Sequence, residues 1–238
     1  MQKELILKHD TLQTITTKFD SIKEHRFFNS CVQDIYQRDK IKDDLYYPVN
    51  IDSYSTKSSL SYGAAFTEII ELIEYLRSDR VEVPLEGTVV WCTTLIYGYK
   101  VDRVNKTISV MWNRELIPLL SGDMVRGKFC LYDGRLAEVP SYRRYLLGEL
   151  LQRNFWQFKK KVESSSFTLT LPDIKKAINL IEGEYPDYRE FNRCVIKPTL
   201  RDLEKILGLK IVASGNKYRV IFTAVNWSEQ LNNREKIV

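Results

Sequence analysis

The sequence predicts an α+β protein made of two domains, residues 1–138 and residues 139–238. Stretches with apolar residues at helical spacing alternate with stretches in which every second residue is apolar, so helices and strands are interleaved. From Tyr142 onwards the predicted order is helix, strand, helix, helix and hairpin, and the first half ends in a similar way. We place the boundary just before Pro140, where a new helical period begins.

The composition is that of a folded protein with a mildly basic surface. The chain has 238 residues, of which 44% are hydrophobic and 28% charged, with a net charge of +5. This balance permits nucleic-acid binding without requiring it. Residues 1–9 lack the apolar core of a signal peptide, and no stretch reaches the roughly 18 apolar residues of a membrane span. We therefore expect a soluble, cytoplasmic protein with no membrane partner.

The cysteines and histidines argue against a metal centre. The four cysteines are far apart and form no C-x-x-C pair: Cys31, Cys92, Cys130 and Cys194. Neither a zinc site nor a disulfide framework is indicated, so we expect reduced thiols, no metal and no cofactor.

The stretch from Tyr185 to Gly208 predicts the helix around which the second domain is organised. At about 100° per residue its apolar residues gather on one broad face, which is made of Phe191, Val195, Ile196, Leu200, Leu203, Ile206 and Leu207. Arg193, Lys197 and Arg201 follow one another at i, i+4 and i+8 on the opposite face. Asp187 is placed as the N-cap and Gly208 as the left-handed residue that ends the helix.

Pro198 leaves two interpretations of this helix open. Inside a helix it removes a backbone donor and crowds the carbonyl of Cys194, which predicts one long helix with a bend. Alternatively, the long helix begins only at Pro198, and residues 188–197 form a separate preceding turn. We favour one bent helix, because the apolar periodicity continues from Phe191 through Leu207.

Positive charge is concentrated in the same region. Residues 189–219 contain eight lysines and arginines against three acidic residues, an excess of five that equals the net charge of the whole chain. The remainder of the protein is close to neutral. A local basic excess of this kind is typical of a surface that meets phosphates.

The first half contains one clear amphipathic helix, with Phe66, Ile69, Ile70, Ile73 and Leu76 on one side. A polar segment over residues 51–63 leads into it, and an earlier helix is indicated between about Ser21 and Asp39. One interpretation of the helix start is that Lys57, Ser59 and Tyr62 meet phosphates through their polar groups and the exposed backbone N–H groups. The other interpretation is that this helix only packs in the core.

Two hairpins are predicted. Alternating residues from Val89 to Tyr97 and from Thr107 to Trp112 form the arms of the first, and Asn113 is placed as the N-cap of a helix over residues 114–120. Residues 209–213 and 217–223 flank the turn Ser214-Gly-Asn216 in the second. Helices that run into a hairpin follow the order of a winged-helix domain.

Residues 61–225 resemble the plasmid replication initiator family of the RepB/RepE type. The most specific stretch is Tyr188-Arg-Glu-Phe-Asn-Arg-Cys-Val-Ile-Lys-Pro-Thr-Leu200, and supporting stretches are Tyr142–Leu151, Leu169–Ile174 and Ile108–Leu120. The resemblance implies two winged-helix domains related by an approximate internal repeat. It also implies that the second domain binds repeated origin sites, while the first contacts DNA or mediates dimers.

Physical chemistry assigns roles to the basic residues of the second domain. Arginine pairs with guanine and asparagine with adenine in the major groove, so we expect Arg189, Asn192 and Arg193 to contact bases. We expect the remaining cations to contact phosphates: Lys197, Arg201, Lys217 and Arg219. The alternative interpretation is that these are solvated surface charges.

Enzyme chemistry is not expected. A nicking enzyme would need paired histidines beside a nucleophilic tyrosine, but the two histidines, His9 and His25, lie sixteen positions apart. A phosphate-binding G-x-x-x-x-G-K-[ST] loop is absent from the sequence, which argues against ATP-driven activity.

We therefore expect an initiator that binds repeated origin sites, or iterons, in double-stranded DNA, opens the origin and recruits a host helicase or host initiator. A homodimer is a further expected state. The alternatives are a winged-helix transcriptional repressor that controls its own gene without initiating replication, and a winged-helix adaptor that binds only proteins.

Overall fold

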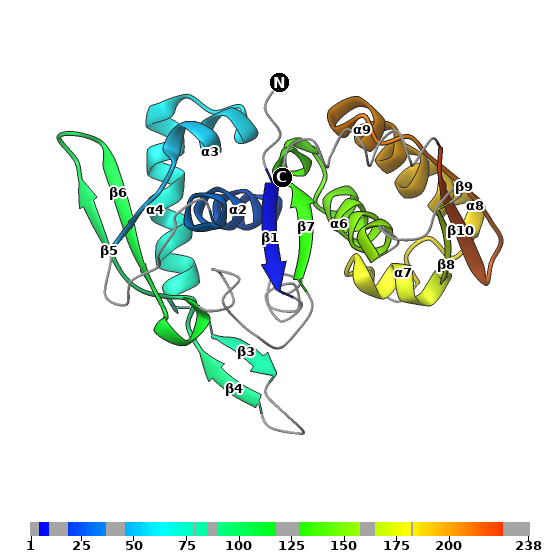
Figure 1. The fold of residues 1–238 in the computed structure, drawn as a ribbon, viewed down its shortest axis with the longest axis horizontal. Helices are drawn as coiled ribbons and strands as arrows, with labels where there is room; N and C mark the ends of the chain where they lie inside the picture. Colours follow the sequence, from blue (N-terminus) through cyan, green and yellow to red (C-terminus); the bar gives the residue numbers. More distant parts are fainter. Residues whose placement is uncertain are drawn as a thin grey trace. The chain divides into compact units, whose positions relative to one another are not determined.

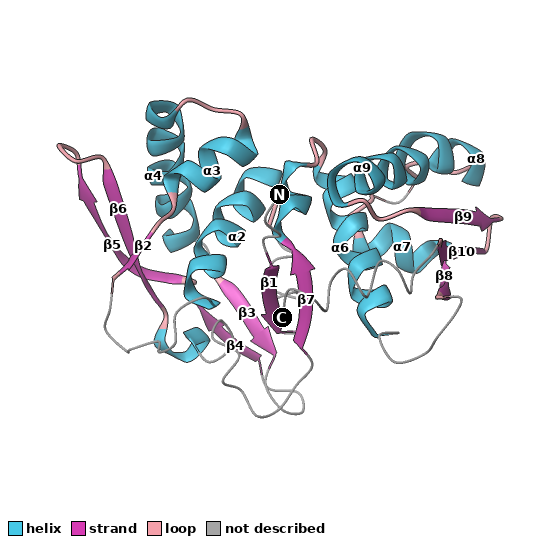
Figure 2. Ribbon diagram, turned by 45° about the horizontal axis from the view of Figure 1, so that its top comes forward, coloured by secondary structure: helices cyan, strands magenta, loops and turns pink. Residues whose placement is uncertain are grey.

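The computed structural model describes residues 5–9, 19–36, 46–78, 80–84, 90–117, 129–157, 165–181 and 183–225 (Figure 1). The chain divides into two compact units, Met1–Ala137 and Glu138–Val238. Each unit combines helices with a small antiparallel sheet (Figure 2). In the described part of the chain, no helix has the length and apolar character needed to cross a bilayer.

The centre of the first unit is a three-helix, three-stranded domain. The helices are α2 (Ile22–Tyr36), α3 (Ile51–Ser58) and α4 (Tyr62–Ser78). The strands are β2 (Tyr47–Pro48), β5 (Ile96–Asp102) and β6 (Thr107–Trp112), which form an antiparallel sheet in the order β2-β6-β5. The β5–β6 hairpin runs alongside α4 in both ribbon views (Figures 1 and 2).

Burial of apolar side chains holds this domain together. The inner face of α4 contributes Ala65, Ile69 and Ile73, all fully buried, as the helical period predicts. Opposite them lies Trp112 of β6, whose ring meets that of Phe28 from α2 edge-on at 5.8 Å between centroids. The helices and the sheet therefore share one core.

Two further antiparallel strand pairs belong to the first unit. Strand β3 (Val81–Pro84) pairs with β4 (Val90–Thr93), between α4 and β5 in the chain. Strand β1 (Leu5–His9) pairs with β7 (Phe129–Asp133), which is followed by the 3₁₀ helix η2 (Gly134–Glu138). A shorter 3₁₀ helix, η1 (Arg114–Leu116), follows β6.

The second unit repeats the central order of elements. Helix α6 (Tyr142–Gln157) is followed by β8 (Ser166–Thr170), α7 (Leu171–Ala177) and a long helical segment. That segment consists of α8 (Tyr188–Phe191), the π-helical η3 (Asn192–Ile196) and α9 (Lys197–Leu207). It leads into β9 (Ile211–Gly215) and β10 (Arg219–Ala224).

The sheet of the second unit has the order β8-β10-β9, which matches β2-β6-β5 in the first. Phe167 of β8 and Phe222 of β10 stack at 5.5 Å, and Phe155 of α6 meets Phe167 edge-on at 4.8 Å. In both units the strand that comes last in the chain, β6 or β10, therefore lies in the centre of the sheet. It pairs with the first strand, β2 or β8, on one side and with β5 or β9 on the other. The predicted fold, two winged-helix domains related by an internal repeat, is confirmed.

The structure corrects three details of the first half. The run from Val89 to Tyr97 is not one arm of a hairpin: β4 pairs with β3, and β5 is the partner of β6. Asn113 is followed by a 3₁₀ helix, Arg114–Leu116, and its amide N–H donates to the carbonyl oxygen of Thr94 at 3.1 Å, a contact that the sequence did not predict; residues 118–120 of the predicted helix lie outside the described residues. The polar segment after Asn50 contains a helix, α3, that the sequence did not predict.

Candidate nucleic-acid interface

The ends of the long helical segment are fixed as the sequence predicts. The Asp187 carboxylate accepts a hydrogen bond from the backbone N–H of Arg189 at 3.2 Å, and this caps α8. At the other end Gly208 is left-handed, with φ of 67°, and its N–H donates to the carbonyl oxygen of Glu204 at 3.0 Å. The segment therefore begins and ends at residues suited to those positions.

The interior of the segment supports the favoured interpretation of one continuous helix and adds a π turn that the sequence did not predict. Residues 191, 192, 196 and 197 all have right-handed helical torsions, so the chain stays helical throughout. The N–H of Lys197 donates to the carbonyl oxygen of Asn192, five residues earlier, which is the hydrogen bond of a π turn. Pro198 follows directly, inside the continuous segment, and has no N–H to donate to the preceding turn.

The π turn changes which side chains line up. Asn192 is the backbone hydrogen-bond partner of Lys197 across the π turn, and Arg201 follows Lys197 by four residues, about one α-helical turn. Asn192, Lys197 and Arg201 form a row along one groove, and Arg193 of the predicted row is not among the residues that line that groove. Arg193 is exposed on the neighbouring strip of the helix.

The new row borders a shallow groove between the helix and the edge strand β9, which we call the helix–strand groove. Its lining residues are Asn192, Lys197, Leu200, Arg201, Glu204, Ile211, Val212 and Ala213. The nearby acid Asp202 faces away, because its carboxylate pairs with Arg144 of α6 at 3.3 Å. Two cations, an amide and the acid Glu204 thus share one side of a groove with an edge strand on the other.

The turn of the second hairpin, residues 216–219, forms the wing of the second unit. The Asn216 side chain accepts hydrogen bonds from the N–H groups of Tyr218 and Arg219 at 2.9 and 3.2 Å, which holds the turn closed. The carbonyl oxygen of Tyr218 accepts from the N–H of Leu171 at 2.8 Å, which ties the wing to the start of α7. Lys217 and Arg219 are both exposed on this wing.

The corresponding turn of the first unit, residues 103–106, is also basic. The Asp102 carboxylate accepts from the N–H groups of Val104 and Asn105, each at 2.9 Å, and these hydrogen bonds lower the pKa of Asp102. Arg103 and Lys106 are exposed on the turn. Sequence reasoning treated this segment only as a polar turn, although its two cations within four residues were a visible signal.

The three candidates at the start of α4 lie in different environments. Lys57 is only 5% exposed, so it does not occupy the open surface that a phosphate contact requires. Ser59 is exposed and left-handed, with φ of 56°, at the end of α3. Tyr62 is 36% exposed, and its hydroxyl donates to the carbonyl oxygen of Lys106 at 2.9 Å. We therefore leave Lys57 out of the proposals below.

No family model matches this sequence, and no curated protein matches it either. Solved structures do match. The Pi initiator protein, in a crystal structure with iteron DNA, has a TM-score of 0.75 at 12% identity, over 94% of this chain and 98% of that chain. This chain therefore has the fold of the Pi initiator protein. At 12% identity the match shows the fold and leaves function to be tested.

Two other solved structures are similar at lower scores. Domains 2–3 of RctB match with a TM-score of 0.47 at 13% identity, over 98% of this chain and 94% of that one. The WH1 domain of MSBI1.176, a replication protein isolated from a multiple sclerosis patient, matches with a TM-score of 0.38 at 10% identity, over 47% and 87%. Among the described residues, no group of three histidines, cysteines or acids is arranged to hold a metal ion.

Proposed function

We propose that this chain binds repeated sites in double-stranded DNA at a replication origin and initiates replication there. The observation that carries the proposal is the match, over nearly the whole chain, to an initiator structure that contains iteron DNA. The basic helix and the two basic wings support it, because phosphate contacts supply most of the affinity of such proteins. The same proposal includes that the chain opens the origin and recruits a host helicase or host initiator.

Within this proposal, the helical segment of the second unit enters the major groove. Asn192 and Arg193 contact bases, with Arg189 beside them at the helix start, because the amide and guanidinium groups match adenine and guanine edges. Lys197 and Arg201 contact the DNA backbone, together with Lys217 and Arg219 of the wing. The first unit adds backbone contacts through Ser59, Arg103 and Lys106, or mediates a homodimer.

The experiment is DNA binding followed by footprinting on the DNA that flanks the coding region. We expect protection of direct repeats spaced about two helical turns apart, beside an A·T-rich block. The double variant Lys197→Ala with Arg201→Ala should weaken binding at every repeat. Lys176→Ala removes an equally exposed cation from α7 and should leave binding unchanged.

The adaptor and repressor alternatives predict other results. An adaptor would bind DNA weakly or not at all, and the Lys197 and Arg201 variants would behave like wild type. A protein that protects repeats but opens no DNA would be a repressor. An affinity that does not fall between about 50 and 200 mM salt would contradict the phosphate contacts proposed here.

A further inference from the structure

Each wing meets a tyrosine from the first residue of the helical segment that precedes it. In the first unit this residue is Tyr62, which begins α4, and its hydroxyl donates to the carbonyl oxygen of Lys106 at 2.9 Å. Lys106 is the last residue of the turn, directly before β6. The hydroxyl of a helix residue is thus bonded to the backbone of the wing.

In the second unit the corresponding residue is Tyr188, which begins α8. A β-carbon built on Gly215 would lie 2.9 Å from the Tyr188 hydroxyl oxygen and 2.7 Å from the carbonyl oxygen of Arg219. Only a residue without a side chain leaves room for this approach. Burial raises the pKa of Tyr188, as expected for a phenol packed against the hairpin.

The two tyrosines contact opposite ends of equivalent turns in the repeat. Both turns have four residues between paired strand ends, which are Asp102 and Thr107 in one unit and Gly215 and Val220 in the other. In the first unit the tyrosine hydroxyl bonds the backbone of Lys106, at the end of the turn, whereas in the second the Tyr188 hydroxyl lies against Gly215, the last residue before the turn. Each turn also carries two cations: Arg103 and Lys106, or Lys217 and Arg219.

We infer that Tyr62 and Tyr188 are positioning residues that hold each basic wing against the start of its helix. They thereby fix the distance between the helix contacts and the wing contacts on DNA. A hairpin tip that was free to move would lose conformational entropy on binding, and a tyrosine restrains it at low cost because it has only two side-chain torsions. This inference rests on the proposed function.

The test in the second unit is a double-mutant cycle in which the measured quantity is the salt dependence of DNA binding. Binding of the full chain to a mixed-sequence duplex of about 30 base pairs, roughly three helical turns, is measured against salt concentration. Lys217→Ala with Arg219→Ala should lower the slope of log K against log salt by about 1.8, since each lost phosphate contact removes about 0.9. Tyr188→Ala should lower it too, and should add nothing when combined with the wing variant.

Two glycine variants test the same contact without touching the tyrosine. Gly215→Ala places a methyl group against the Arg219 carbonyl and the Tyr188 hydroxyl, and should reproduce the loss of slope. Gly63→Ala is the control, because a β-carbon there meets nothing within 4 Å. Far-UV circular dichroism identifies any variant that has lost its fold, and Tyr188→Phe then replaces Tyr188→Ala in the cycle.

The first unit offers a matched pair of tyrosines on one helix. Tyr62 and Tyr75 of α4 are 36% and 41% exposed, and each donates a hydrogen bond, Tyr62 to the wing and Tyr75 to Asp20 at 3.3 Å. Tyr62→Phe should lower the salt slope, whereas Tyr75→Phe should not. Equal slopes for the two variants would overturn the inference for this unit.

The outcomes separate the inference from the proposed function. If wild type does not bind the duplex, the proposed function itself fails. If wild type binds and the Tyr188 effect adds in full to that of the wing variant, or leaves the slope unchanged, the tyrosine does not act through the wing and the inference fails alone.

Discussion

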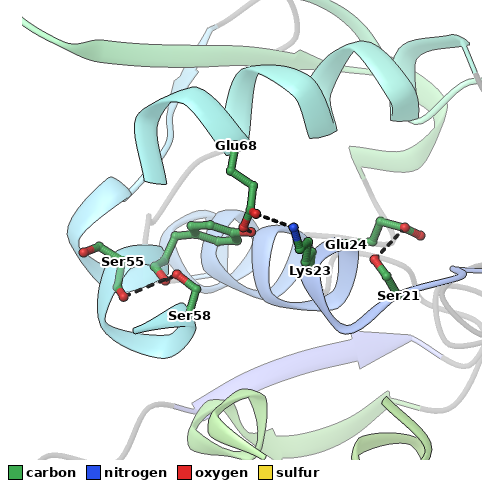
Figure 3. Close-up of polar contacts among 7 residues, drawn as sticks. Ser21, Lys23, Glu24, Ser55, Ser58 and Glu68 are labelled. Atoms are coloured by element: carbon green, nitrogen blue, oxygen red, sulfur yellow. Dashed lines mark hydrogen bonds and ion pairs between the residues drawn. The ribbon is translucent and has the colours of Figure 1, made fainter. Parts of the chain in front are cut away.

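Glu68 of α4 links three helices of the first unit through its carboxylate. It accepts a hydrogen bond from the buried Tyr54 hydroxyl of α3 at 2.5 Å and pairs with the Lys23 ammonium of α2 at 2.5 Å (Figure 3). Burial raises the pKa of Glu68, but the hydrogen bonds from Lys23 and Tyr54 outweigh it and hold the pKa below its ordinary value. The charged form of this carboxylate is therefore the one that the folded state stabilises.

Glu68→Ala should lower the free energy of unfolding by about 1–3 kcal/mol, the cost of leaving a buried polar group without its partner. The Tyr54 hydroxyl is fully buried and would lose the acceptor that it has in this cluster. Glu71→Ala makes the same change at an exposed position of α4 and controls for helix propensity. Urea unfolding of both variants measures the difference; equal stabilities would show that the Glu68 cluster contributes nothing.

The pH dependence of stability should reveal the same residue. A carboxylate whose folded pKa lies below its unfolded value stabilises the protein above the unfolded value, near 4.5, and loses that contribution as pH falls through the folded pKa. Glu68→Gln cannot titrate, so its unfolding free energy should fall less steeply than that of wild type below pH 4.5. Parallel pH profiles for the two proteins would contradict the lowered pKa.

Arg193 and Lys197 should respond differently to alanine substitution, because one is proposed to contact bases and the other phosphates. Arg193→Ala should cost about 1–3 kcal/mol at the specific site and relax base preference at one position. Lys197→Ala should weaken specific and non-specific binding alike and lower the salt slope by about 0.9. Competition binding against single-base variants of one repeat distinguishes the two; identical profiles would refute the division of roles.

Among the secondary-structure elements, the helical segment 188–207 shows what sequence could and could not predict. Its caps depend on local residues, Asp187 and Gly208, and both were predicted correctly. Its buried face was predicted less well. Thr199 is fully buried, and its hydroxyl donates to the Val195 carbonyl oxygen at 2.8 Å. Leu200, which was predicted to be on the buried face, is half-buried at the groove. A pattern that counts only apolar residues misses a polar group satisfied by its own helix.

The strands show the same limit at longer range. The run from Val89 to Tyr97 has continuous alternation, so nothing local indicates that β4 and β5 pair with different partners. Strand β1 pairs with β7, more than 100 residues away, and has no partner signal nearby. Strand pairing is decided by neighbours in space, whereas the long helices α4 and α6 could be predicted from their own period.

Pro198→Ala should weaken site affinity roughly tenfold, about 1.4 kcal/mol, while leaving the unfolding free energy within about 1 kcal/mol of wild type. Alanine restores a backbone donor at the position where the π turn gives way to α9, which allows an ordinary α-helical turn and moves Asn192 out of line with Lys197. Pro172→Ala is the control, since Pro172 lies in a first helical turn, that of α7. If affinity for the repeats is unchanged in Pro198→Ala, the π turn has no part in DNA binding.

At the scale of the whole molecule, the repeat of helix, strand, helix, helix and hairpin was predicted from the sequence and is present in the structure. The two sheets share their strand order, and the two wings share their length and their paired cations. The repeat could be predicted from the order of elements in the second half, because its segments are short and well punctuated by turns. In the first half the β3–β4 pair, inserted between α4 and β5, hid it.

A chain with two basic winged-helix units can do more than occupy a DNA site. The proposed initiator function predicts that the bound DNA opens. At saturating protein, thymines in the A·T-rich segment beside the repeats should become reactive to permanganate. The double variant Lys197→Ala with Arg201→Ala should lose this reactivity with binding, whereas Lys176→Ala should keep it. If wild type protects every repeat and no thymine reacts on a supercoiled template, the chain binds its sites without opening them, and the repressor alternative replaces the initiator.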